Sequence, residues 1–176
     1  NPNTPSKLEK ILRAGHLAVT SECGPPRGSD AAHIVHKAEL IKNHVDAINI
    51  TDNQTSVCRL CSLAACIRLK LMGLEPVLQM VVRDRNRIAL QSDILGAASF
   101  DIHNLLCLSG DHQRFGDCAQ GQNVFDLDST QLVQTIKMMR LNKSGGKYGI
   151  ADMPTYLRAS GGVSGALSGT TYNIGQ

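Results

Sequence analysis

Four acidic side chains stand where short apolar runs end, and they are the residues of this chain best placed to do chemistry. The runs are HLAVTSE, DAINIT, PVLQMVV and IHNLLCLSGD, and the acidic residues at or just beyond their ends are Glu22, Asp52, Asp84 and Asp111. Grouped carboxylates serve as general acids and bases, because burial and mutual repulsion raise the pKa of one member of the group. They also supply the oxygen ligands that a divalent cation takes. The sequence leaves both uses open.

An aspartate at the end of a strand can also do no more than cap the helix that follows. Asp84 fits that structural role, because a helical pattern begins just after it. Glu22 does not fit it, because Gly24-Pro25-Pro26 follows and leaves no helix nearby to cap. We therefore expect Glu22 to serve the function of the protein and not its local structure.

The apolar runs alternate with segments of helical periodicity, which is the pattern of a parallel α/β protein. A capping box of Ser6 and Glu9 opens a short first helix that Gly15 ends. Further helices are predicted at about 34–41, 57–71, 88–95 and 132–139, the last of them capped by Asp128 or Ser129. Strands that are apolar along most of their length indicate a sheet covered on both faces.

Two architectures fit four strand–helix units, a doubly wound sheet and a barrel. The phosphate-binding fingerprint G-x-G-x-x-G is missing from the first strand–helix turn, and no Walker loop occurs in the chain. These two observations argue against a nucleotide-binding doubly wound sheet. In either architecture the carboxyl ends of the strands form the ligand-binding face, so the acidic residues should converge there.

Cys58, Cys61 and Cys66 form a C-x2-C-x4-C series of the kind seen in zinc and iron–sulfur sites. They fall in a segment of helical periodicity, and a helix turns by about 100° per residue, so the three thiols cannot converge on one ion. We expect no metal site here, and instead buried or half-buried thiols on a helix. Cys23 and Cys107 are expected in the core.

The composition excludes several classes of protein. The 176 residues carry 18 Lys and Arg against 15 Asp and Glu, with three Phe, three Tyr and no Trp, so nucleic-acid binding is not favoured. No stretch approaches the roughly 18 apolar residues of a membrane helix, and the start NPNTPSKLEK is polar and unlike a signal peptide. Six irregularly spaced cysteines are typical of cytoplasmic thiols. The prediction is a cytoplasmic domain that binds neither nucleic acid nor membrane.

Five segments at the strand ends resemble the methylenetetrahydrofolate reductase family, and most closely its form in anaerobic, acetogen-like bacteria. They are SECGPPRG, DAINITDNQ, GLEPVLQMVVRDRNRIALQSDILGA, LCLSGDH and VFDLDSTQL, in this order. The resemblance runs from about residue 7 to 140, with a weaker continuation at TTYNIG. It implies an α/β fold, the (β/α)8 TIM barrel, that contains a flavin (FAD or FMN). The implied reaction reduces 5,10-methylenetetrahydrofolate to 5-methyltetrahydrofolate, with NAD(P)H or another donor supplying electrons.

The resemblance also implies roles for individual residues. Glu22 matches the family's catalytic acid, which protonates a folate nitrogen and opens the five-membered ring to an iminium that accepts hydride. Asp111, the second catalytic position, matches an aspartate beside the flavin ring and the pterin. The matching cofactor-binding positions are Thr51, Asp52, Gln79, Ser109, Gly110, Asp111 and Asp126. Relatives carry Thr-Cys where this chain has Val81-Val82, so one hydroxyl of the family pattern is missing.

The same resemblance implies that the chain carries about strands one to five of a barrel. Four strand–helix units use about 142 residues, so eight would need roughly 280, near the usual barrel size of about 250. We expect residues 1–176 to form one partial flavin-binding domain, with a Gly- and Ser-rich loop at 143–170 before the fifth strand. Residues beyond 176 or a partner chain would then complete the sheet.

Folate is the implied substrate. The implied partners are further copies of this chain, or a small zinc-binding companion subunit like that of some acetogen-type relatives. Two other functions stay open. One is a non-catalytic subunit that keeps half of a barrel within a larger assembly, and the other is a metal-dependent barrel lyase that uses Glu22, Asp52 and Asp111.

Overall fold

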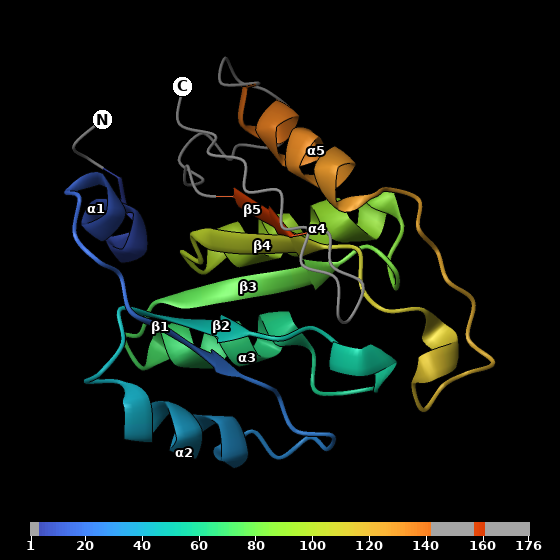
Figure 1. Ribbon diagram of the computed structural model, residues 1–176, viewed down its shortest axis with the longest axis horizontal. Helices are drawn as coiled ribbons and strands as arrows, with labels where there is room; N and C mark the ends of the chain where they lie inside the picture. The colour runs from blue at the N-terminus through green and yellow to red at the C-terminus, as the bar shows by residue number, and fades with distance from the viewer. Residues whose placement is uncertain (1–3, 142–156, 161–176) are drawn as a thin grey trace.

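The alternation of strands and helices is present in the structure, a computed structural model in which residues 4–141 and 157–160 are described (Figure 1). The elements, with η for a single 3-10 turn, are α1 (Lys7–Arg13), β1 (Thr20–Cys23), α2 (Ala32–Ile41), β2 (Ala47–Ile50), η1 (Gln54–Ser56), α3 (Ser62–Leu71), β3 (Pro76–Val81), α4 (Arg87–Ser99), β4 (Asn104–Leu108), η2 (Gln113–Phe115), α5 (Ser129–Leu141) and β5 (Leu157–Ser160). Each of the first four strands is followed by a helix, as predicted.

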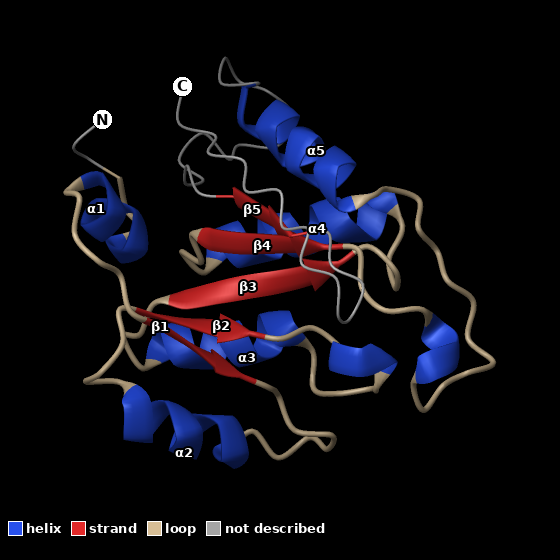
Figure 2. Ribbon diagram, in the orientation of Figure 1, coloured by secondary structure: helices blue, strands red, loops and turns tan. Residues whose placement is uncertain are grey.

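The five strands form one parallel sheet whose spatial order equals the order along the chain, β1-β2-β3-β4-β5. A doubly wound sheet begins in its middle and reverses direction once, so its strand order is not sequential. A sequential order with right-handed crossovers places the helices on one face of the sheet, and Figure 2 shows α3 and α4 behind the strands and α2 below β1. The structure is therefore that of a partial (β/α) barrel, and the doubly wound alternative is excluded.

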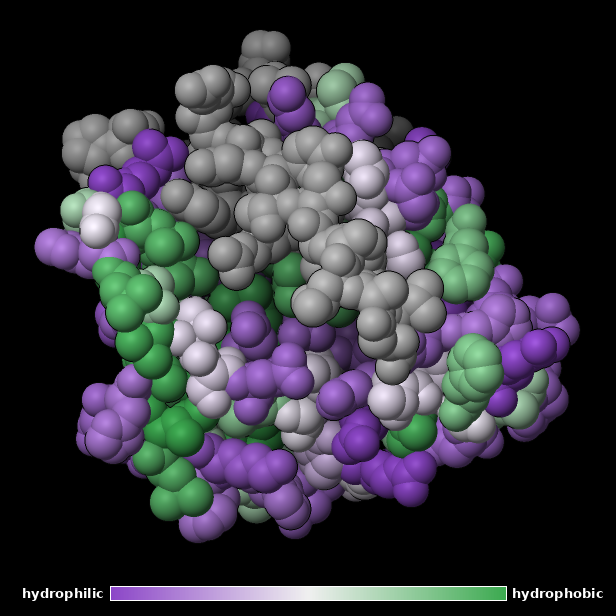
Figure 3. All heavy atoms as spheres, in the orientation of Figure 1, coloured by the Kyte–Doolittle hydropathy of each residue, from purple (hydrophilic) through white to green (hydrophobic). Residues whose placement is uncertain are grey.

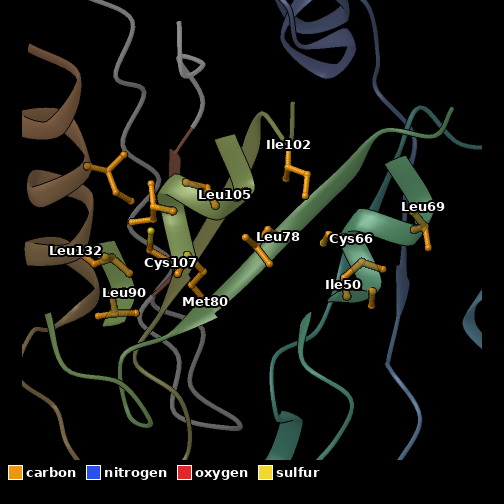
Figure 4. Packing of buried hydrophobic residues seen from close by; sticks show 14 of the residues in the cluster. Ile50, Cys66, Leu69, Leu78, Met80, Leu90, Ile102, Leu105, Cys107 and Leu132 are labelled. Carbon is orange, nitrogen blue, oxygen red and sulfur yellow. The ribbon is translucent and has the colours of Figure 1, made fainter. Parts of the chain in front are cut away.

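The core lies between the sheet and these helices. Its labelled members in Figure 4 are Ile50, Leu78, Met80, Leu105 and Cys107 from the strands, Cys66, Leu69, Leu90 and Leu132 from the helices, and Ile102 from the segment just before β4. Burial of each large side chain of this kind contributes about 1.5–3 kcal/mol to folding. Among the described residues, no helix is both long and apolar enough to cross a membrane.

The opposite face of the sheet carries polar side chains. Successive strand residues point to opposite faces, so Glu22, Asn49 and Gln79 point away from the helices that bury Ile50 and Leu78. Figure 3, which views this face, shows hydrophilic residues across its centre. In a barrel this face is the interior, and its carboxyl end is where ligands bind.

Helix α1 lies at the end of the sheet where the strands begin (Figure 1). Ser6 caps it, as predicted, by accepting a hydrogen bond from the backbone nitrogen of Glu9 at 3.0 Å. The Ser6 hydroxyl donates to the Asn104 side chain at 2.8 Å, and the Asn104 amide donates to Glu75 at 2.8 Å. These bonds fasten α1 to the amino ends of β3 and β4, at the end of the sheet opposite the expected ligand site.

The helix predicted over 57–71 is shorter in the structure, because α3 begins at Ser62. Asn53, Thr55 and Ser56 have positive φ angles of 42°, 56° and 58°, and they turn the chain through η1 before the helix starts. The apolar residues at 57 and 60 are half-buried in this loop. Their spacing matches a helical period although their backbone is not helical.

Two of the three cysteines in the C-x2-C-x4-C series lie before the helix, which corrects the prediction. Cys58 is exposed in the loop before α3, and Cys61, also exposed, is the N-cap of α3. Only Cys66 is buried on the helix. Cys23 and Cys107 are buried in the core, as predicted.

The last described strand, β5, lies inside the segment 143–170 for which the sequence predicts a loop. It pairs with β4 in parallel, from the Leu105–Leu157 pair to the Leu108–Ser160 pair. These four residues extend the sheet, so the loop prediction is wrong for them. The strand predicted at TTYNIG, residues 170–175, lies outside the described residues.

Candidate active site

The carboxyl ends of the strands bring two of the predicted site residues face to face. Glu22 is the third residue of β1 and its side chain is exposed, whereas Gln79 is the fourth residue of β3 and is only 5% exposed. The Gln79 amide nitrogen lies 3.5 Å from Glu22 Oε2, at the outer limit of a hydrogen bond. The acid and the amide are therefore neighbours across β2.

Thr51 directly follows β2 and is 3% exposed. Its buried hydroxyl has no hydrogen-bond partner among the described residues. A Cβ placed on Gly24 would lie 3.4 Å from this hydroxyl, which therefore reaches the backbone just after β1. Burying an unpaired hydroxyl costs about 1–3 kcal/mol. A native structure that keeps such a group calls for a specific explanation, and a bound ligand is one.

Asp52 is also buried, but protein donors satisfy its carboxylate. Oδ2 accepts hydrogen bonds from the backbone nitrogen of Val81 at 2.9 Å and from Arg85 at 2.6 Å, and Oδ1 accepts from Arg85 at 3.2 Å. Arg85 also pairs with Asp93 of α4 at 3.0 Å. In this arrangement the Asp52 carboxylate fixes the end of β3 and links it to α4.

A buried arginine that the sequence analysis did not single out organises this end of the sheet. Arg83, just after β3, is 1% exposed and donates five hydrogen bonds. Two go to the Asp84 carboxylate at 2.6 and 2.7 Å, and one goes to the Asn53 carbonyl at 3.3 Å. The others reach the Ser56 hydroxyl at 2.8 Å and the Asp111 carbonyl at 3.0 Å. One guanidinium thus joins the loops that follow β2, β3 and β4.

Asp84 is the counter-ion of Arg83 and does not cap the next helix, so the capping role is wrong. The N-cap of α4 is Asn86, whose side chain accepts a hydrogen bond from the backbone nitrogen of Ala89 at 3.1 Å. Burial raises the pKa of Asp84, but hydrogen bonds from Arg83 and Asn53 outweigh burial, and the net pKa lies below its usual value. Asp84 is therefore held as the anion that balances Arg83.

The turn Ser109-Gly110-Asp111 follows β4, and its three residues are half-buried. Gly110 has a φ of +87°, and a Cβ there would lie 3.3 Å from Arg83 Nη1. The Asp111 carbonyl accepts hydrogen bonds from the Ser56 hydroxyl at 2.9 Å and from Arg83. The backbone of the turn is therefore held from two sides, which fixes the point from which the Asp111 side chain starts.

Replacing Gly110 with alanine tests how far this turn depends on glycine. We expect Gly110→Ala to lower the free energy of unfolding by about 1–3 kcal/mol, because it combines a left-handed φ with a close approach to Arg83. The matched control is Gly28→Ala, since a Cβ at Gly28 meets nothing within 4 Å and its φ is not positive. Urea titrations of both variants measure the effect, and equal stabilities would contradict it.

Asp126 has a local structural contact in addition to its predicted role. It is exposed, and its Oδ2 accepts a hydrogen bond from the backbone nitrogen of Arg87 at 2.7 Å, at the start of α4. A carboxylate is stabilised there by the helix dipole. Asp128 and Gln131 exchange backbone–side-chain hydrogen bonds at 2.6 and 2.9 Å, which confirms Asp128 as the cap of α5.

The acidic residues at the strand ends do not form a metal centre. Within 4–141 and 157–160, no three His, Cys, Asp or Glu side chains are grouped so that they could hold an ion. Asp52 and Asp84 are paired with Arg85 and Arg83. The metal-dependent lyase therefore finds no support in the described residues. The signal in the sequence for these pairs is the segment RDRNR just after β3, whose first two arginines are Arg83 and Arg85.

The comparison with protein families bears on the same residues. The family model described as methylenetetrahydrofolate reductase matches residues 7–156 of the 176. No curated protein matches the chain in a sequence search. The matched range includes every candidate site residue described above, from Glu22 to Asp126. With the parallel sheet in sequential order and this match over most of its length, the chain belongs to the methylenetetrahydrofolate reductase family.

Proposed function

We propose that this chain supplies the flavin-binding face and the catalytic acid for the reduction of 5,10-methylenetetrahydrofolate to 5-methyltetrahydrofolate. Family membership gives the reaction class, that of an oxidoreductase of the methylenetetrahydrofolate reductase type. The observation that carries the finer proposal is the contact between Glu22 and Gln79 at the carboxyl ends of β1 and β3. The unpaired, buried hydroxyl of Thr51 adds to it.

The polar groups at this end of the sheet fit a flavin. The pyrimidine edge of a flavin presents both carbonyl oxygens and an N–H group, and the Thr51 hydroxyl and the Gln79 amide can each donate and accept. A ligand that pairs with Thr51 removes the cost of burying its hydroxyl unpaired. When bound, the flavin supplies the hydride for the folate, and NAD(P)H is the electron donor we propose.

Glu22 is the proposed general acid. Its side chain is exposed on the face of the sheet opposite the helices, where a folate can reach it. Glu22 donates its proton to a nitrogen of the folate five-membered ring, and the bond from that nitrogen to the bridging carbon breaks. The bridging carbon then becomes the iminium centre that accepts hydride. Gln79, which faces Glu22 Oε2, orients the carboxyl group.

Asp111 is proposed to contact the pterin and the cofactor. Its backbone is fixed by Ser56 and Arg83, so its side chain starts from a position set before any ligand binds. Ser109 and Gly110 belong to the same turn and are proposed to pass close to the cofactor. Asp52 is proposed to hold the end of β3 in place and not to bind the cofactor through a free carboxylate, because that carboxylate is hydrogen-bonded to Arg85 and to the backbone of β3.

Replacing Thr51 with valine separates a cofactor contact from a structural role. Valine keeps the shape of threonine and removes a buried hydroxyl that has no partner among the described residues. We expect Thr51→Val to leave the free energy of unfolding of the flavin-free chain unchanged or slightly higher, and to weaken flavin binding about fivefold, the value of one hydrogen bond. Denaturant titration and calorimetric flavin titration measure the two effects.

Thr130→Val, at an exposed position of α5, is the matched control and should change neither quantity. A Thr51→Val chain that binds flavin as tightly as the parent would count against Thr51 as a cofactor contact. A marked loss of stability of the flavin-free Thr51→Val chain would instead show that the hydroxyl stabilises the fold.

A further inference from the structure

Two cysteines that the proposed reaction does not use lie in the loops beyond the carboxyl ends of the strands. Cys58 precedes α3 and is exposed, and Cys118 follows η2 and is half-buried. Both line one pocket of about 270 Å³, whose walls also include Arg83 and Asp84. The two thiols therefore lie in the same solvent-accessible pocket, next to the ion pair of Arg83 and Asp84.

Backbone packing holds these two loops against each other. A Cβ on Gly116 would overlap the carbonyl oxygen of Ser56, so the close approach requires glycine. Just beyond that point, the Asp117 carboxylate accepts a hydrogen bond from the backbone nitrogen of Cys58 at 2.9 Å. Cys118 directly follows Asp117 in the chain. This bond therefore holds the backbone of Cys58 against the residue that precedes Cys118.

We propose that Cys58 and Cys118 form a reversible disulfide that links the β2–α3 loop to the β4–α5 loop. The oxidant is a small-molecule disulfide of the glutathione class. The Cys58 thiolate attacks it, which forms a mixed disulfide and releases one small thiolate. Cys118 then loses its proton to water and attacks the Cys58 sulfur, which forms the protein disulfide and releases the second small thiolate. The two cysteines lose two electrons, and the small disulfide gains them.

The other thiols are placed differently. Burial raises the pKa values of Cys23 and Cys66, and that of Cys107 to about 12, and no oxidant reaches these side chains in the core. The negative charge of Asp117 raises the pKa of Cys118, which therefore serves as the resolving thiol after Cys58 has reacted. Cys61 is exposed and three residues from Cys58, so it is the competing partner that an experiment must exclude.

The link would act on the proposed site through Ser56. The Ser56 hydroxyl donates to the Asp111 carbonyl at 2.9 Å, and Ser56 lies two residues before Cys58. Oxidation would therefore link the β2–α3 loop, whose Ser56 binds the Asp111 carbonyl, to the β4–α5 loop, which contains Asp111. The proposal itself rests on the two loops and stands whether or not the chain binds a flavin.

The experiment treats the full chain with oxidised glutathione, unfolds it, alkylates the remaining thiols with N-ethylmaleimide and maps the peptides by mass spectrometry. The reduced chain has six thiols. We expect the oxidised parent to keep four alkylated cysteines and to yield a Cys58–Cys118 linked peptide that disappears after reduction. The melting temperature should rise on oxidation, since the link closes a long loop of the unfolded chain.

Three single variants serve as controls. Cys61→Ser should still form the link, whereas Cys58→Ser and Cys118→Ser should show neither the linked peptide nor the rise in melting temperature. Cys118→Ser should instead accumulate the mixed disulfide on Cys58. A parent chain that keeps all six thiols would overturn the proposal, and so would a Cys58–Cys61 link as its main product.

Discussion

The Glu22→Gln variant is expected to lose at least about 100-fold in folate reduction while its flavin stays bound and reducible, because general acid catalysis contributes about 100- to 10,000-fold. Glutamine keeps the length of the side chain, and its amide oxygen can still accept from Gln79, which lies 3.5 Å from Glu22 Oε2 in the parent. It has no acidic proton to give to the folate nitrogen. Anaerobic stopped-flow measurements with reduced flavin follow the folate step alone.

Glu39→Gln is the matched control for this substitution. Glu39 is an exposed glutamate of α2 that pairs with Lys42, so the same change there removes a charge away from the sheet. Its folate reduction should equal that of the parent. If Glu22→Gln retains folate turnover within about tenfold of the parent, Glu22 is not the general acid.

The Arg83→Met variant is expected to lose about 3 kcal/mol in the free energy of unfolding, the low end of the effect of removing one partner of a buried ion pair, because the remaining Asp84 carboxylate is only half-buried. Methionine fills much of the same space but donates none of the five hydrogen bonds that Arg83 makes. It leaves the Asp84 carboxylate, and the Asp111 carbonyl, without that donor. Chemical denaturation followed by circular dichroism measures the loss.

Arg87→Met makes the same substitution at an exposed arginine at the start of α4 and should change stability by less than about 0.5 kcal/mol.

The pH dependence of stability gives a second check on Arg83→Met. The folded-state pKa of Asp84 lies below its usual value, so the pair stabilises the fold above about pH 4 and loses that contribution as pH falls through the folded pKa. The difference between parent and variant should therefore be largest near neutral pH. A difference that grows on acidification would contradict the assigned pairing.

The alternation of parallel strands with helices and the polar strand ends could be predicted from the sequence, because both follow from local periodicity. The sequential strand order was expected only from the resemblance to a barrel family. Apolar runs followed by helical patterns require parallel strands, and parallel strands deliver their carboxyl ends to one edge. Glu22 was singled out because the Gly-Pro-Pro segment after it offers no helix to cap. Gln79 was named only through the resemblance to a family, and its contact with Glu22 was found in the structure.

The parts that could not be predicted depend on contacts between loops far apart in the chain. Arg83 reaches Ser56 and Asp111, which lie 27 and 28 residues away from it, and no local pattern reports such distances. The start of α3 was misplaced because positive φ angles at 53–56 are set by that packing and not by residue type. Asp84 was expected to cap α4, but it pairs with its buried neighbour Arg83 and accepts a hydrogen bond from Asn53, which lies 31 residues away.

The most direct test of the proposed function is the anaerobic reaction of methylenetetrahydrofolate with this chain after its bound flavin has been chemically reduced. We expect the visible absorption of the oxidised flavin to return as the folate is added, with one 5-methyltetrahydrofolate formed for each flavin reoxidised. A folded chain that holds reduced flavin, stays bleached with the folate and regains its absorption only with oxygen would contradict it.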